Sequence, residues 1–129
     1  MIRVFVSSCD VDSTHPAALL HKLREGGFGV LHSPRKDQGA MVKRDSLNAL
    51  DQTDIFIIAV TENWQFSTWM QHEAWEAQKR LRAGNIQKLL FYNPEKIEVT
   101  VQGMLPLLHE PLPDDLEESV LFLRSLCRR

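Results

Sequence analysis

The start of one predicted helix carries the two side chains of this sequence that are best suited to chemistry. Trp69 and Glu73 are four residues apart, so they share one face of a helix. An indole offers a stacking or cation–π surface to a positively charged ring. A carboxylate stabilises positive charge as it develops on a ribose carbon. Together they suit cleavage of a nicotinamide–ribose bond, which needs no general acid because the leaving ring is already cationic.

Both side chains also have a purely structural interpretation. Glu73 could be a solvated carboxylate on the helix surface, paired with Lys79 or Arg80. Trp69 could pack the helix against a sheet, although one ring can both pack and stack on a ligand. The catalytic interpretation therefore requires that Glu73 lie where a ligand binds.

Other familiar sites lack a residue that they require. A phosphatase with this order of elements would have a cysteine, five further residues and then an arginine. Cys9 is present, but His15 stands where the arginine is required. A phosphoacceptor domain would end its third strand in aspartate, where the sequence has Val60 and Thr61. Residues 26–29 are glycine-rich but follow a helix pattern, so they are not a dinucleotide fingerprint. The histidines and cysteines show no metal-ligand spacing, so we expect no metal site.

The composition is that of a single globular domain. The chain has 129 residues, of which 43% are hydrophobic and 25% charged, and this is enough to bury a core. We therefore expect one domain over residues 1–129, which could belong to a longer protein. The formal net charge of −2 disfavours nucleic acid as a partner. Two distant cysteines, no signal-peptide pattern and no apolar run of about 20 residues predict a cytoplasmic protein without a membrane span.

Short apolar runs predict the strands of a parallel sheet. The clearest run is Asp54–Val60, which is apolar on both faces and is therefore expected at the centre. The other predicted strands are Val4–Val6, Phe28–Leu31, one within Ile86–Tyr92, and a short edge strand at Leu105–Leu108.

Two helices are predicted in the first half of the chain. The first has Pro16 in its opening turn and is stopped by residues 26–27, both glycine. The second follows a polar loop and would turn Val42, Leu47 and Leu50 inward.

Two further helices are predicted in the second half. Thr68 and Gln71 fit a capping box, so the third helix is expected from Thr68 to Arg82, with Gly84 after its end. Asp114 or Asp115 is expected to cap the last helix. Its inward face would consist of Leu116, Val120, Leu123 and Cys127.

Strands and helices alternate along the chain, which predicts an α/β fold with helices on both faces of an open parallel sheet. With about five strands, the expected order is 2-1-3-4-5. Ligands in such sheets bind beyond the carboxyl ends of the strands, where the strand order reverses. The loops expected there are Ser7–Thr14, His32–Gly39 and Thr61–Thr68.

Several of these segments resemble the Toll/interleukin-receptor (TIR) family, over about residues 2–92. The matching segments are Val4–Ser7 followed by Asp12, Ser33–Pro34 through Gly39, Ala49–Val60, Asn63–Trp64, and Ser67 with Trp69. Glu73 falls where NAD-cleaving members of the family carry their catalytic glutamate. The sequence departs from the family at Met70, where cysteine is frequent, and at Ser8, where an aromatic residue is frequent.

The resemblance implies a flavodoxin-like sheet and a nucleotide pocket around Glu73. The pocket would be shaped by Ser67 and Trp69 together with the first loop. That loop would contribute Ser7, Ser8, Cys9 and Asp10. Without a ligand, the loop residues would be solvated or would cap the first helix. Arg35 could meet a diphosphate or a neighbouring TIR domain, or be an ordinary surface charge.

The function that the resemblance implies is that of a NAD glycohydrolase or cyclase. NAD would be the substrate, with no further cofactor, and the product would be ADP-ribose or a cyclic isomer. Activity would depend on self-association of TIR domains, in immune or anti-phage signalling. Two alternatives remain open: a non-enzymatic TIR scaffold, and a nucleoside-transferring enzyme that also uses a glutamate.

Overall fold

The computed structural model describes residues 2–8, 14–32, 48–61, 68–97 and 110–126. Six residues within these ranges are described by their backbone alone, namely Thr14, His15, His32, Thr68, Trp69 and Glu110. The described elements follow the order β1, α1, β2, β3, α3, β4, β5 and α4, so strands and helices are interspersed along the chain.

Five parallel strands form one sheet in the order β2-β1-β3-β4-β5, which confirms the predicted order. The strands are β1 (Arg3–Ser7), β2 (Gly29–His32), β3 (Ile55–Ala59), β4 (Lys88–Tyr92) and the two-residue β5 (Glu110–Pro111). The central strand β3 pairs with β1 and β4. Every residue of β3 is buried, which explains why its sequence is apolar on both faces.

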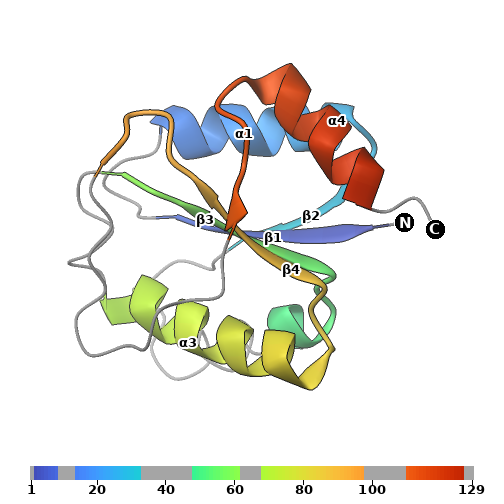
Figure 1. Cartoon of the computed structure of the whole chain (residues 1–129), viewed down its shortest axis with the longest axis vertical. Coiled ribbons are helices and arrows are strands. Elements are labelled where there is room, and N and C mark those ends of the chain that lie inside the picture. The colour runs from blue at the N-terminus through green and yellow to red at the C-terminus, as the bar shows by residue number, and fades with distance from the viewer. Residues whose placement is uncertain (1, 9–13, 33–47, 62–67, 98–109, 127–129) are drawn as a thin grey trace.

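Helices cover both faces of the sheet (Figure 1). α1 (Thr14–Glu25) and α4 (Leu116–Leu126) lie on one face, and α3 (Thr68–Ala83) lies on the other. The helical residues 48–51 lie on the α3 side, where Leu50 joins the same core. Each face of the sheet therefore has its own hydrophobic core.

Side chains along β1 alternate between these two cores. Val4 and Val6 pack in the core under α1 and α4, whereas Phe5 packs in the core under α3. The ring of Phe5 stacks on that of Phe56 with centroids 5.3 Å apart. Because side chains two residues apart in a strand share a face, Ser7 lies on the α3 side, like Phe5.

The ends of the helices follow the signals in the sequence. Gly27 after α1 and Gly84 after α3 both have a positive φ, 86° and 85°, as helix-ending glycines often do. Asp115, rather than Asp114, caps α4: its Oδ1 accepts the backbone N–H groups of Glu117 (2.9 Å) and Glu118 (3.1 Å). Asp114 pairs instead with Lys96.

Some predicted boundaries differ from the structure, and some lie outside the described residues. β2 begins at Gly29, because the N–H of Phe28 still bonds to the carbonyl of Leu23 at the end of α1. The predicted edge strand at 105–108 lies outside the described ranges, as do Val42, Leu47 and Cys127. The described fifth strand is Glu110–Pro111, after which the N–H of Leu112 donates to the carbonyl of Phe91 at 2.8 Å.

Candidate functional site

Glu73 and Ser7 meet beyond the centre of the sheet, on the side of α3. The hydroxyl Oγ of Ser7 donates to Oε1 of Glu73 at 2.8 Å. Both residues have a relative exposure of 0%. Ser7 is the last residue of β1 and Glu73 lies in the second turn of α3, so the contact joins two elements that are 66 residues apart in sequence.

Local sequence explains how these side chains come together. Ser7 is at the carboxyl end of β1 and faces α3 because of the strand alternation. On α3, the buried stripe contains Met70, Ala74 and Ala77, and Glu73 belongs to the same stripe. The two alanines are small, which favours close packing of the helix on the sheet. A buried carboxylate requires hydrogen-bond donors, and Ser7 supplies one.

The interpretation of Glu73 as a solvated, ion-paired carboxylate is wrong. Lys79 and Arg80 pair with Glu76 instead, at 3.0 Å and 2.9 Å, and Arg80 also reaches Asp51 at 2.9 Å. Burial raises the pKa of the Glu76 carboxyl, but hydrogen bonds from Lys79 and Arg80 outweigh it and lower the pKa below its ordinary 4.5. The carboxylate on the outer side of α3 is thus Glu76, three residues after Glu73.

The other predicted site residues are described only in part. Ser8 follows β1 directly and is half-buried. The backbone of Trp69 lies in the first turn of α3, and its side chain is not among those described. The remaining predicted residues, Cys9, Asp10, Arg35 and Ser67, lie outside the described ranges.

Thr61 is a further polar residue at this edge, and its position directly after the predicted central strand is the signal that could have identified it. It follows β3 by two residues and is only 3% exposed.

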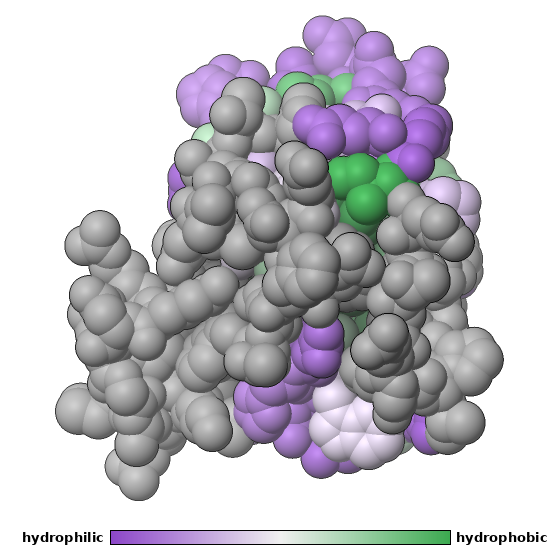
Figure 2. All heavy atoms as spheres, turned by 90° about the vertical axis from the view of Figure 1, so that its left-hand side faces the viewer, coloured by the Kyte–Doolittle hydropathy of each residue, from purple (hydrophilic) through white to green (hydrophobic). Residues whose placement is uncertain are grey.

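Figure 2 looks onto this side of the molecule, with the layer of α1 and α4 at the top and that of α3 at the bottom. The described residues in both layers are mostly hydrophilic in this view.

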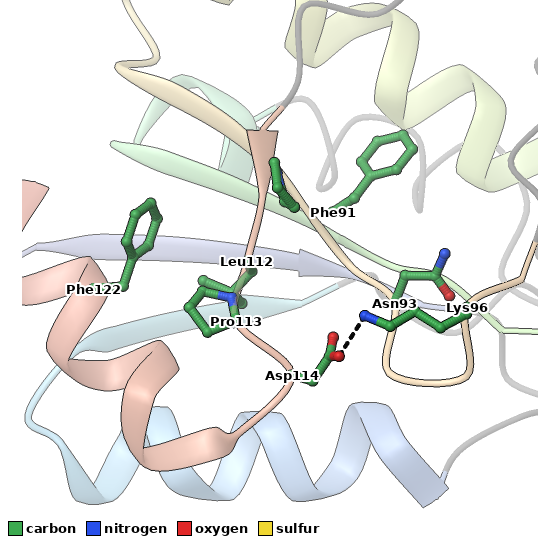
Figure 3. Close-up of a pocket in the computed structure, with 8 residues that line it drawn as sticks. Phe91, Asn93, Lys96, Leu112, Pro113, Asp114 and Phe122 are labelled. Carbon is green, nitrogen blue, oxygen red and sulfur yellow. Dashed lines mark hydrogen bonds and ion pairs between the residues drawn. The ribbon is translucent and has the colours of Figure 1, made fainter.

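A separate cavity of about 590 Å³ opens beside β4, β5 and α4. Figure 3 shows the ammonium group of Lys96 directed toward the carboxylate of Asp114, with which it pairs. The described lining comprises Phe91, Asn93, Lys96, Pro111, Leu112, Pro113, Asp114 and Phe122. Neither Ser7 nor Glu73 belongs to this lining, so the cavity and the buried carboxylate are different places in the fold.

The described ranges contain neither a cluster of metal-ligating side chains nor a helix that could span a membrane. No group of three or more histidine, cysteine, aspartate or glutamate side chains there is placed to hold a metal ion. None of the helices in that part of the chain combines the length and the apolar character of a membrane span.

Comparisons with known proteins bear on the fold. No model of a protein family matches this sequence, and no curated protein matches it. Among solved structures, the chain is similar to the TIR domains of the activated Roq1 resistosome, which directly recognises the pathogen effector XopQ. The TM-score is 0.59 with 18% identity, over 74% of this chain and 60% of that one. The match thus spans less than two thirds of the Roq1 chain.

A second similar structure is a protein from Burkholderia pseudomallei whose name relates it to pilus assembly. Its TM-score is 0.58 with 19% identity, over 98% of this chain and 89% of that one. Both likenesses concern the fold. The chain has a TIR-like, flavodoxin-like α/β fold.

Proposed function

We propose that this chain is a TIR-type domain that cleaves the nicotinamide–ribose bond of NAD, with Glu73 as its catalytic residue. The observation that carries the proposal is the buried carboxylate of Glu73, held by Ser7 at the carboxyl side of a parallel sheet. Ligands bind at this side of open α/β sheets. The resemblance of the sequence to NAD-cleaving TIR domains supports the proposal, because Glu73 falls where those members carry their catalytic glutamate.

The proposed reaction begins with heterolytic cleavage of the bond between the ribose carbon and the nicotinamide nitrogen. The electron pair leaves with nicotinamide, which becomes neutral, and positive charge develops on the ribose. The carboxylate of Glu73 stabilises that charge, and the hydrogen bond from Ser7 orients the carboxylate. Attack by water, with loss of a proton, gives ADP-ribose, whereas attack by a nucleophilic atom of the substrate itself gives a cyclic isomer.

The complete burial of Glu73 sets a condition on this function. A carboxylate with 0% exposure in the isolated chain cannot touch substrate until the edge of the site opens. We propose that self-association of TIR domains supplies this opening, so that activity rises more steeply than in proportion to protein concentration. A role in defence signalling fits the proposal, since the similar Roq1 structure is a resistosome that recognises a pathogen effector.

The same burial favours a second candidate, a TIR scaffold without catalytic activity. In that case the Ser7–Glu73 hydrogen bond would be a structural contact between β1 and α3. Signalling would then depend on association alone, and NAD would not be consumed at any concentration.

Substrate assays with the wild-type chain separate these functions. NAD and free nucleosides would be incubated with the protein over a wide concentration range, with and without a fused oligomerising domain, and the products resolved by chromatography. We expect release of nicotinamide from NAD at high concentration or after fusion. Cleavage of nucleosides but not NAD would indicate a nucleoside-transferring enzyme, and no turnover in any assembly state would leave the scaffold.

A further inference from the structure

Buried serine and threonine hydroxyl groups in the described chain differ in whether they have a hydrogen-bond partner, and this difference points to a ligand. The buried serines and threonines there are Ser7, Thr53, Thr61 and Ser119. Three of them donate within the chain: Ser7 to Glu73 at 2.8 Å, Thr53 to the carbonyl of Ala49 at 2.8 Å, and Ser119 to the carbonyl of Pro113 at 2.6 Å. The hydroxyl of Thr61 has no hydrogen-bond partner among the described residues.

Thr53 and Thr61 form a natural comparison because they flank the same strand. Thr53 precedes β3 and Thr61 follows it, and their exposures are 2% and 3%. A buried hydroxyl without a partner destabilises a folded chain, so such groups are rare and call for an explanation. The satisfied threonine is at the amino end of β3, and the unsatisfied one is at the carboxyl end, where ligands bind in this class of sheet.

Thr61 adjoins the start of α3 through its chain neighbour. Val60 packs in the same core cluster as Met70, which lies one turn before Glu73 and Ala74. On the other side, Ser7 is paired in register with Ile58, three residues before Thr61. Thr61 therefore belongs to the same edge as the Ser7–Glu73 pair.

Gln78 is a buried polar residue of α3 whose side-chain atoms likewise lack partners in the described part of the chain. Gln78 lies past the middle of α3, which runs away from the carboxyl edge toward the start of β4. Its place in the fold does not favour a role beside Glu73.

We propose that Thr61 is a substrate-binding residue whose hydroxyl hydrogen-bonds to the nicotinamide riboside half of NAD. This inference rests on the proposed function, because the substrate is defined by Glu73. A hydroxyl can donate and accept, so it suits the ribose hydroxyls and the carboxamide of that half. The bond would form equally in the bound substrate and in the transition state, so its loss raises KM and leaves kcat nearly unchanged.

The first test needs no ligand. Valine has nearly the shape of threonine but lacks the hydroxyl, so Thr61→Val and Thr53→Val form a matched pair. We expect Thr53→Val to lower Tm, because it removes the 2.8 Å hydrogen bond from the buried hydroxyl to the Ala49 carbonyl, which then keeps the N–H of Gln52 as its donor. Thr61→Val should leave Tm unchanged or raise it. A fall in Tm as large as that of Thr53→Val would show that the Thr61 hydroxyl has a structural role, and would overturn the inference whether or not NAD is cleaved.

The second test measures binding and turnover with active, assembled protein. Thr61→Val should raise KM for NAD about five- to tenfold, the effect of one lost hydrogen bond, with little change in kcat. Thr61→Ser should restore the wild-type KM, and Thr53→Val should leave it unchanged. In calorimetry, Thr61→Val should weaken the binding of nicotinamide mononucleotide and leave the binding of AMP unaffected.

The outcomes separate this inference from the proposed function. An active Thr61→Val with an unchanged KM, or with weakened AMP binding alone, overturns the role of Thr61 and leaves the proposed function standing. Failure of the wild type to bind or cleave NAD overturns the proposed function, and the substrate assignment of Thr61 with it.

Discussion

Ser7 Oγ donates to Glu73 Oε1 at 2.8 Å, and this contact links the end of β1 to the second turn of α3 inside the protein. Hydrogen bonds to charged groups are stronger than those between neutral groups, and a buried carboxylate depends on them. The contact therefore has two consequences. It contributes to the stability of the α3 face, and it sets the orientation of the side chain that we propose to be catalytic.

The stability consequence predicts the effect of Ser7→Ala. Removing a donor from a buried carboxylate should lower the free energy of unfolding by about 1–3 kcal/mol in urea titrations. Ser125→Ala is a control, because that exposed hydroxyl bonds only to the nearby carbonyl of Phe122 and should change stability by less than about 0.5 kcal/mol. In a double-mutant cycle, Ser7→Ala and Glu73→Gln should be clearly non-additive. Additive effects would mean that the hydrogen bond contributes nothing.

The ion pair of Glu76 on the outer side of α3 predicts that the stability of the fold depends on pH. The Glu76 and Arg80 side chains are 17% and 16% exposed, so their ion pair is only partly screened by water. Because the folded pKa of Glu76 is below 4.5, its contribution is complete above pH 4.5 and is lost as the pH falls through the folded pKa. Glu76→Gln should therefore destabilise the protein by about 1 kcal/mol at pH 7 and have little effect in strong acid.

The same substitution at an exposed position provides the control for Glu76. Glu118→Gln, in the first turn of α4, should change the free energy of unfolding by only a few tenths of a kcal/mol at pH 7. Chemical denaturation between pH 3 and 7 measures both variants. A loss for Glu76→Gln that is equal at both ends of this range would contradict the account of the ion pair.

The capping of α4 predicts different effects for two adjacent aspartates. Asp115→Ala removes the acceptor for the N–H groups of Glu117 and Glu118 and should cost about 1 kcal/mol. Asp114→Ala removes an exposed pair with Lys96 and should cost less than about 0.5 kcal/mol. Thermal unfolding of both variants checks the order, and a larger loss for Asp114→Ala would show that the cap is assigned to the wrong residue.

The sequence predicts the elements whose signals are local. The apolar run around β3 and the capping-box pattern at Thr68 are complete within a few residues, and the structure confirms the strand and a helix that begins at Thr68. The edge strand is harder, because the leucine-rich run 105–108 is a strong local signal. That run lies outside the described residues, and the described edge strand is Glu110–Pro111, which pairs with β4 although it has little strand propensity of its own.

The site could be predicted only in part, for a similar reason. The position of Glu73 in the second turn of a helix follows from the chain itself. Its burial does not, because Glu73 and Glu76 are both helical carboxylates, and only packing decides which one faces the sheet. The contact with Ser7 depends in addition on the alternation of β1 and the rotation of α3 about its axis.

The most direct test of the central claim is NAD turnover by assembled protein that carries Glu73→Gln, compared with wild type and with Glu76→Gln. The glutamine keeps the shape of the buried side chain, and Glu76→Gln makes the same change one turn away on the outer side of α3. We expect nicotinamide release by the wild type and by Glu76→Gln, and a loss of kcat of at least about 100-fold in a folded Glu73→Gln. Equal turnover by all three proteins would contradict the catalytic role of Glu73.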